Sequence, residues 1–448
     1  MFSSPRRQLP EAFFAGCSRC AGCLLVAVGL VLGIFCQRSL AVPVSVPVPC
    51  ECAPDDPHAG KGRFSADYSW MDQVDKAATP PPDAPVVPAA VGPIVPAAGQ
   101  PAGALSGRII FMSAGHGWTA GASSWSLQRP VLLEMNEDYG NVDQMNMFAA
   151  YCFNAGATVV PFRPIGNQTN AVVLDNDDPG VTFAGAWSDS SAPLFYGSPG
   201  AVPYRFAALA ATESATATYV PTLPAAGLYP VYTWVAHGAN RTFQLYRIRH
   251  TGGESHVRIP HQMVGNGWVY LGTYHFAAGS NPGSGAVIVS NLQPTPGVGS
   301  VVIADAIRFG NGLGVFDRGF GRSTYPSEEE CARYWVQRGL GQGQSPTLYD
   351  PDYPGSSTDD GDDNVGTPPR MAREMNATGV DSSIYRRLLI SFHSNAGGGR
   401  GVVGLWNDNA LFPNTGTPNQ FRLAQLLGAE INNDLSAFGV PPLEVAWN

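Results

Sequence analysis

The chain has 448 residues and a formal net charge of −9, and only 14% of its residues are charged, against roughly 25% in typical globular proteins. The negative charge argues against nucleic acid and against an anionic membrane surface as binding partners. The 52 glycines and 39 prolines favour a loop-rich, β-rich protein over a helical bundle.

The N-terminal segment predicts export from the cytoplasm. Three arginines precede the uncharged run Ala21–Cys36, and small residues follow at Ser39–Ala41. This order is typical of a signal peptide, here residues 1–41, that is cleaved from the mature protein. An uncleaved membrane anchor is the alternative, and it would be the protein's only contact with a membrane. In both cases we expect a secreted, periplasmic or wall-associated protein.

Residues 42–106 are rich in proline and alanine, which predicts a stiff, extended linker. Ordered structure is expected to begin after it. The run Ile109–Met112 is short, apolar and bounded by glycines, as is typical of a buried parallel strand.

A helix is predicted to follow from Glu137. Its apolar residues recur at helical spacing and form one face: Val142, Met145, Ala149, Cys152 and Phe153. Gly156 supplies the C-terminal signal of this helix, and the next residues predict a second strand. The order strand, helix, strand indicates a βαβ unit within an α/β domain.

Residues 174–312 follow a different pattern. Short strand-like runs alternate with Gly, Pro and Asn, which predicts a β-sandwich with its own core and closely spaced ends. Helical and buried-strand patterns return after it, so the sandwich is predicted to interrupt one α/β domain made of residues 107–173 and 313–448. The aromatic residues of the insert predict sandwich core, with a sugar-stacking face as the alternative: Trp234, Tyr246, Trp268 and Tyr270.

Three residues at element ends share the chemistry of a metal site. His116 follows the first strand, Glu137 opens the helix, and His393 follows a later apolar strand. Two histidines and one carboxylate are a ligand set of catalytic zinc, with the fourth position left to water. The carboxyl edge of a parallel sheet is also where α/β enzymes place their sites. The sequence therefore predicts Zn²⁺ as the cofactor.

Four segments resemble the zinc-dependent N-acetylmuramoyl-L-alanine amidases that hydrolyse bacterial peptidoglycan: residues 109–118 (IIFMSAGHGW), 137–163, 370–376 (RMAREMN) and 390–396 (ISFHSNA). The resemblance implies an α/β fold with a mixed, largely parallel sheet flanked by helices. It also implies zinc ligation by His116, Glu137 and His393, and cleavage of the amide between N-acetylmuramic acid and L-alanine. By the same resemblance, Asn141 supports the ligands, and Asn395 orients His393 or the substrate.

The insert resembles golvesin-like modules of secreted bacterial proteins. The matching segments include VVLDNDD (172–178), VTFAGAWSDS (181–190) and VVIADAIRF (301–309). This resemblance implies a domain that binds carbohydrate or cell wall, with peptidoglycan or another wall glycan as the partner.

The amidase family also carries a catalytic glutamate on a late strand. Glu444, in PPLEVAWN, is the local counterpart in this chain. Two interpretations remain open: Glu444 is the catalyst, or the chain stops short of that residue. The second favours an inactive wall-binding surface protein with an amidase-like fold. A zinc peptidase with the same ligands is a further alternative.

Overall fold

The computed structural model describes residues 99–131, 135–293, 299–354, 360–379, 386–394, 403–406, 420–437 and 446–447. The predicted export segment 1–41, the linker up to residue 98, Asn395 and Glu444 lie outside these residues. In the part of the chain that is described, no helix combines the length and the apolar character that a membrane crossing requires.

A three-stranded parallel sheet leads to the predicted metal ligands. Its order is β19 (Arg387–Phe392), β1 (Ile109–Ala114) and β4 (Thr158–Pro161). The central strand β1 is buried along its whole length, as its apolar sequence predicts. Ala114 pairs with Phe392, so β1 and β19 end at the same edge of the sheet.

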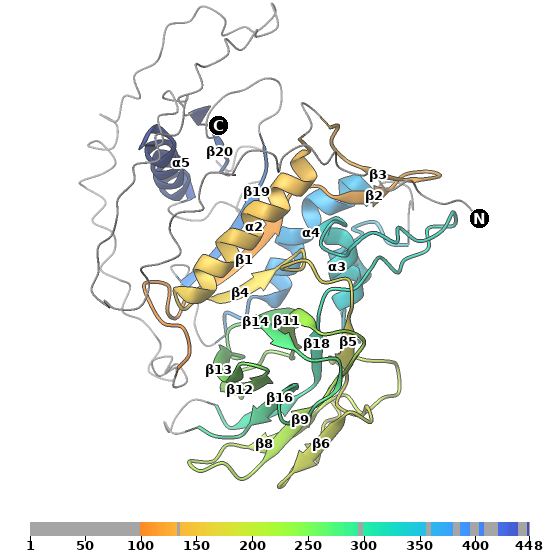
Figure 1. Cartoon of the computed structure of the whole chain (residues 1–448), viewed down its shortest axis with the longest axis vertical. Helices are drawn as coiled ribbons and strands as arrows, with labels where there is room; N and C mark the ends of the chain where they lie inside the picture. Colours follow the sequence, from red (N-terminus) through yellow and green to blue (C-terminus); the bar gives the residue numbers. More distant parts are fainter. Residues whose placement is uncertain are drawn as a thin grey trace, which may run out of the picture. The chain divides into compact units, whose positions relative to one another are not determined.

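Helix α2 (Glu137–Asn154) lies along β1 and β4 (Figure 1). It begins where the sequence predicts, because Asn136 Oδ1 accepts a hydrogen bond from Asp138 N at 2.9 Å and so caps the first turn. The predicted apolar face is buried against the sheet through Val142, Met145, Ala149 and Cys152. The predicted βαβ unit is therefore present as β1, α2 and β4.

Residues 172–309 form antiparallel sheets (Figure 1). One sheet has the order β14 (Trp268–Phe276), β11 (Gly227–Trp234), β18 (Ala306–Phe309) and β5 (Val172–Leu174). A second has the order β13 (Gly253–Pro260), β12 (Phe243–His250), β16 (Ala286–Ser290), β9 (Thr216–Tyr219) and β6 (Val181–Ala184). Two small sheets complete this segment: β17 (Val301–Ala304), β8 (Arg205–Ala208) and β7 (Ser188–Asp189), and β10 (Thr222–Leu223) with β15 (Gly279–Ser280).

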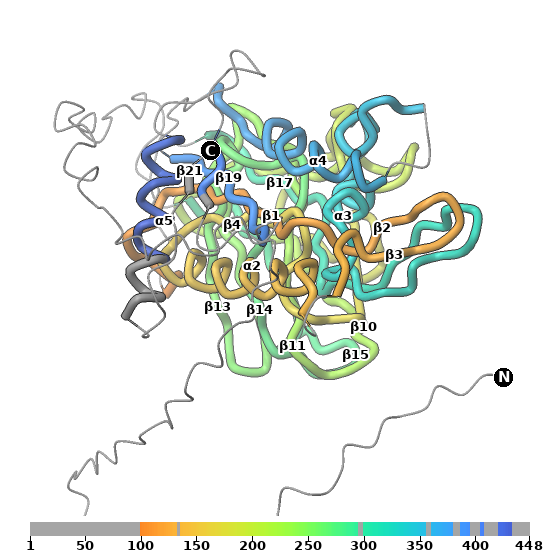
Figure 2. The backbone as a smooth tube through the Cα atoms, turned by 90° about the horizontal axis from the view of Figure 1, so that it is seen from above, coloured from red at the N-terminus to blue at the C-terminus, as the bar shows by residue number. Residues whose placement is uncertain are grey.

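The remaining described elements belong to none of these sheets. They are the hairpin β2 (Trp118–Ala120) and β3 (Trp125–Leu127), α3 (Ala332–Gly339), η1 (Pro346–Leu348), α4 (Asp360–Met375), α5 (Gln420–Ala437) and the pair β20 (Val403–Gly404) and β21 (Ala446–Trp447). Helices α3 and α4 pack together, and β2 lies beside α4 (Figure 2).

The two ends of the sandwich segment lie side by side, because β5 pairs with β18 and Leu174 lies opposite Ile307. The expected separate core is not found in the described residues, where each of two hydrophobic clusters mixes sandwich residues with residues of the βαβ unit. Polar contacts also join the sandwich to its neighbours. Ile165 N, shortly after β4, donates to Tyr232 Oη at 2.8 Å, and Trp234 Nε1 donates to Gly339 O of α3 at 2.8 Å. The sandwich and the βαβ unit therefore share one interior.

The aromatic residues of the insert belong to this interior. Trp234, Tyr246, Trp268 and Tyr270 are all buried. The core interpretation is confirmed for these four side chains, and the sugar-stacking alternative is wrong for them.

The predicted fold class is wrong for the chain. Of the fourteen strand pairings between described elements, only three are parallel, and two of those lie in the small sheet around β1. Most strands come from the Gly- and Pro-punctuated segment 172–309, whose short turns join neighbouring strands in antiparallel pairs. In its described residues the protein is mostly antiparallel β-structure with few helices, and not an α/β protein of the amidase type built on a largely parallel sheet.

Candidate metal centre

The three predicted ligands meet at the carboxyl edge of the parallel sheet. His116 follows β1, His393 follows β19, and Glu137 is the first residue of α2. His116 Nε2 lies 3.1 Å from Glu137 Oε1 and 3.3 Å from His393 Nδ1, and His393 Nδ1 lies 3.7 Å from Glu137 Oε1. Residues up to 277 positions apart in the sequence thus present three donor atoms to one point.

The glycines on either side of His116 permit this approach. A Cβ at Gly115 would overlap the imidazole ring of His393, and a Cβ at Gly117 would lie 2.8 Å from Cys331 N. Gly117 has φ +109°, and His116 itself has φ 62°, in the left-handed region. The sequence Ala-Gly-His-Gly-Trp therefore turns the chain sharply while two other segments pass close to its backbone.

Several donors hold the Glu137 carboxylate. Ser394 N donates to Oε1 at 2.9 Å, Asn141 Nδ2 lies 3.4 Å from the same oxygen, and Arg129 Nε lies 3.4 Å from Oε2. Burial alone would raise the pKa of Glu137, but the Ser394 amide, His116 and Asn141 outweigh it, and the pKa is lowered. Glu137 is therefore a carboxylate at neutral pH. Asn141 also donates to Gly115 O at 3.3 Å, so it links the helix to the histidine turn.

Burial lowers the pKa of both histidines, and the negative charge of Glu137 opposes this only in part. Neutral imidazole is the form that ligates a metal ion. At neutral pH His116 and His393 are thus in the ligating state.

Two buried residues that the sequence reasoning did not single out hold the histidine turn. The Asp138 carboxylate is fully buried and accepts hydrogen bonds from the backbone amides of Gly117, Gln128 (3.3 Å) and Arg129 (3.2 Å). Asp138 could have been identified from the sequence, because it is an acidic residue in the first turn of the predicted helix, directly after Glu137.

Arg163 is the second such residue. It follows β4, and its guanidinium donates to Gly115 O at 3.1 Å and to Glu328 O at 2.7 Å. Complete burial lowers the pKa of Arg163 to about 10, so it remains charged at neutral pH. Arg163 and Asp138 therefore tie the turn that carries His116 to four other segments: the start of α2, the residues after β4, residues 128–129 and Glu328.

The donor set fits a zinc ion. Tetrahedral zinc with bonds of about 2.0–2.1 Å places neighbouring ligand atoms roughly 3.3–3.4 Å apart. The three separations here, 3.1, 3.3 and 3.7 Å, bracket that value. Among the described residues a second acidic group, Asp350, Asp352 and Asp363, also lies close together, but Arg333 forms ion pairs with Asp350 and Asp363 and so supplies the positive charge there.

Residues 172–311 match the family described as Golvesin C-terminal domain. A curated xanthan lyase from Bacillus sp. (strain GL1) is 32% identical over 152 residues, which cover 33% of this chain and 16% of the lyase. The chain thus spans about one sixth of the length of that relative.

Two solved structures are also similar. A Paenibacillus xanthan lyase is 28% identical with a TM-score of 0.27, over 32% of this chain and 13% of that chain. The CBM35 from Cellvibrio japonicus Abf62 is 17% identical with a TM-score of 0.23, over 32% of this chain and 95% of that chain. At such TM-scores the likeness does not define a shared fold. The family match confirms the golvesin-like resemblance of the insert, and these comparisons give no support to the resemblance to zinc amidases.

Proposed function

We propose that this chain is an exported protein that binds a wall glycan through residues 172–311 and hydrolyses peptidoglycan at a zinc centre. The bond cleaved would be the amide between N-acetylmuramic acid and L-alanine, which the sequence resemblance implies. The observation that carries the hydrolytic part is the convergence of His116, Glu137 and His393, whose ligand atoms lie within 4.8 Å of one another.

The glycan-binding part rests on a separate observation. Residues 172–311 match the Golvesin C-terminal domain family, and a relative at 32% identity is named as a lyase of xanthan. Because the chain covers only 16% of that relative, this supports a shared module and not a shared activity. Binding to a wall polymer by this module would raise the local concentration of substrate at the metal centre.

The chain's own residues would prepare the centre for hydrolysis. His116 and His393 would hold the zinc ion through Nε2 and Nδ1, and Glu137 through Oε1. When bound, zinc polarises an amide carbonyl and lowers the pKa of a coordinated water. Ser394 N and Asn141 fix the Glu137 carboxylate. For the proton transfer from water to the leaving L-alanine nitrogen we propose Glu444, which lies outside the described residues.

Metal content tests the centre directly. Elemental analysis of the purified full chain should give about one Zn²⁺ per chain. His116→Ala and His393→Ala should each abolish stoichiometric binding. His256→Ala is the matched control, because His256 pairs with Glu254 on the sandwich at 2.8 Å and should leave the zinc content unchanged. Full zinc in both ligand variants would exclude this centre.

Digestion of purified peptidoglycan tests the reaction. The zinc-loaded chain should release peptides that begin with L-alanine, and Glu444→Gln should lower this rate by about 10²–10⁴-fold without changing the zinc content. Cleavage between amino acids of the stem peptide would instead identify a zinc peptidase.

A second candidate function is glycan binding without hydrolysis, which the family match over 172–311 favours. In that case the chain should sediment with insoluble peptidoglycan but release no peptides. His116→Ala should then leave sedimentation unchanged.

A further inference from the structure

The two oxygens of the Glu137 carboxylate have different partners. Oε1 faces both histidines, at 3.1 Å from His116 Nε2 and 3.7 Å from His393 Nδ1. It also accepts the hydrogen bond from Ser394 N at 2.9 Å. Oε2 instead forms an ion pair with Arg129 Nε at 3.4 Å. The carboxylate therefore presents one oxygen to the proposed metal centre and the other to a guanidinium group.

The backbone of Arg129 is fixed to the start of α2, the helix that carries Glu137. Arg129 N donates to Asp138 Oδ2 at 3.2 Å, and Asn136 Nδ2 donates to Arg129 O at 2.8 Å. Within its own segment, Arg129 Nη1 donates to Gln128 O at 3.3 Å. These contacts hold the guanidinium group beside Glu137, although the Arg129 side chain is 45% exposed.

The positive charge of Arg129 does not by itself favour a metal ion. Burial is the main factor that lowers the pKa of His116 and of His393, and the charge of Arg129 lowers both further. The same charge would repel a divalent cation bound by these histidines. Any benefit of Arg129 to the centre therefore comes from its effect on Glu137.

A carboxylate can bind a metal ion through one oxygen or through both. With one oxygen from Glu137, three protein atoms bind a tetrahedral zinc ion, and the fourth position is left to water or substrate. With both oxygens, the second would compete for that position. The ion pair at Oε2 opposes this competition, because Oε2 would have to leave Arg129 before it could bind the metal ion.

We propose that Arg129 is a positioning residue that keeps Glu137 bound to zinc through Oε1 alone, so that the fourth coordination position stays open to water and substrate. This inference rests on the proposed function and concerns the same centre. It assigns Arg129 a role in the reactivity of the centre and not in its affinity for metal.

Titration with imidazole, a neutral ligand that binds through one nitrogen, tests whether the fourth position is open. The purified full chain is loaded with Co²⁺, whose visible absorption changes with its ligands. Arg129→Met should weaken imidazole binding about tenfold, because the released Oε2 competes for the same position. Arg129→Lys, which keeps a positive charge near Oε2, should bind imidazole with an affinity close to that of the wild type. Because imidazole is neutral, the lost charge of Arg129 does not itself explain weaker binding.

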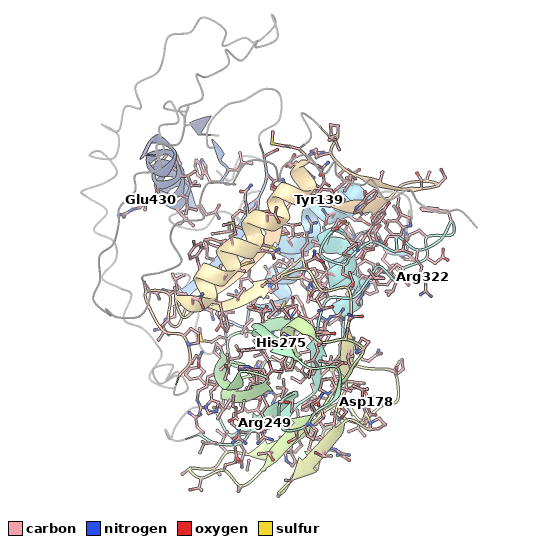
Figure 3. All side chains as sticks on the ribbon, viewed as in Figure 1. Tyr139, Asp178, Arg249, His275, Arg322 and Glu430 are labelled. Carbon is pink, nitrogen blue, oxygen red and sulfur yellow. The ribbon has the colours of Figure 1, made fainter. Side chains whose placement is uncertain are left out.

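Arg249→Met is the matched control. Arg249 lies near the end of β12 in the sandwich (Figure 3), and its Nε pairs with Glu254 Oε2 at 3.0 Å. The Arg249 side chain is 38% exposed, close to the value for Arg129. The change removes the same kind of ion pair and should alter neither the Co²⁺ spectrum nor the imidazole affinity.

The zinc affinity separates positioning from simple support. In Arg129→Met it should not fall, because the variant loses a repulsive charge and gains a ligand oxygen. A fall of about tenfold or more, with unchanged imidazole affinity, would mean that Arg129 only supports the carboxylate, and the proposal would be wrong. Unchanged affinities for both zinc and imidazole would also overturn it and leave the proposed function standing. A wild-type chain that binds neither Co²⁺ nor Zn²⁺ would overturn the metal centre and this inference together.

Discussion

Gly115 and His393 are in direct contact, and the imidazole ring occupies the space where a Cβ of residue 115 would lie. The contact follows from the strand register: Ala114 pairs with Phe392, and Gly115 and His393 are the residues that directly follow this pair. Gly115 N donates to Phe392 O at 2.8 Å, which extends the ladder by one bond. The position of the His393 ring therefore depends on the absence of a side chain at position 115.

Gly115→Ala should displace His393 and weaken zinc binding by about tenfold or more, as is typical when the groups that orient a ligand are disturbed. Zinc affinity can be measured by competition with a chelator of known strength. The chain should remain folded, because the added methyl group meets a side chain at the edge of the sheet.

Gly140→Ala is the matched control for this change. Gly140 lies in α2, close to the same site, and a Cβ there would meet nothing within 4 Å. Alanine should stabilise the helix by about 0.5–1 kcal/mol and leave zinc affinity unchanged. Equal zinc affinities for the two variants would contradict the role assigned to Gly115.

Asp138→Ala should destabilise the protein by about 1–3 kcal/mol, because three backbone amides lose their buried acceptor. Urea unfolding measures the loss, and the zinc affinity should fall as the His116 turn loosens. Asp143→Ala, on the exposed side of the same helix, should change neither quantity by a comparable amount. Normal zinc affinity in Asp138→Ala would show that the turn is held by other contacts.

Tyr232→Phe should destabilise the sandwich and the βαβ unit together. The change leaves the Ile165 amide without its acceptor in a buried environment, at a cost of about 1–3 kcal/mol. Since the two parts share one interior, zinc release and near-ultraviolet circular dichroism should report a single transition on urea unfolding. Tyr229→Phe removes a part-buried hydrogen bond from the hydroxyl group to Ala225 O, at 2.8 Å, and should cost less. Two separated transitions would argue that the sandwich folds alone.

Glu328 predicts a dependence of stability on pH. Burial raises its pKa to about 7, from an ordinary value of 4.5. Between these values the folded chain keeps a proton that the unfolded chain has released, so this residue makes the free energy of unfolding fall as pH rises from about 4.5 to 7.

Glu328→Gln replaces the titrating carboxyl group by a neutral amide, so the variant lacks this loss of stability. As pH rises from about 4.5 to 7, the variant should therefore become more stable relative to the wild type. Urea unfolding at several pH values measures the difference. A constant difference between pH 4.5 and pH 7 would contradict the raised pKa.

Local sequence patterns determined the elements around the metal centre. The apolar run at Ile109 specified a buried strand, and the helical spacing from Glu137 specified α2, because both depend on which faces of a short segment avoid water. The positions of His116, Glu137 and His393 at the ends of elements could also be predicted, since a parallel arrangement of two strands brings their carboxyl ends to one edge.

Only the tertiary structure decided the rest. The balance of antiparallel over parallel pairing depends on which strands meet across the whole chain, and apolar runs do not encode their partners. Asp138 and Arg163 contact the backbone of the histidine turn across 21 and 48 positions of the sequence, and Arg163 also contacts Glu328 O across 165 positions. The shared interior of the sandwich and the βαβ unit also depends on tertiary structure. The apolar face of each element can be read from the sequence, but which other face covers it depends on how the elements pack.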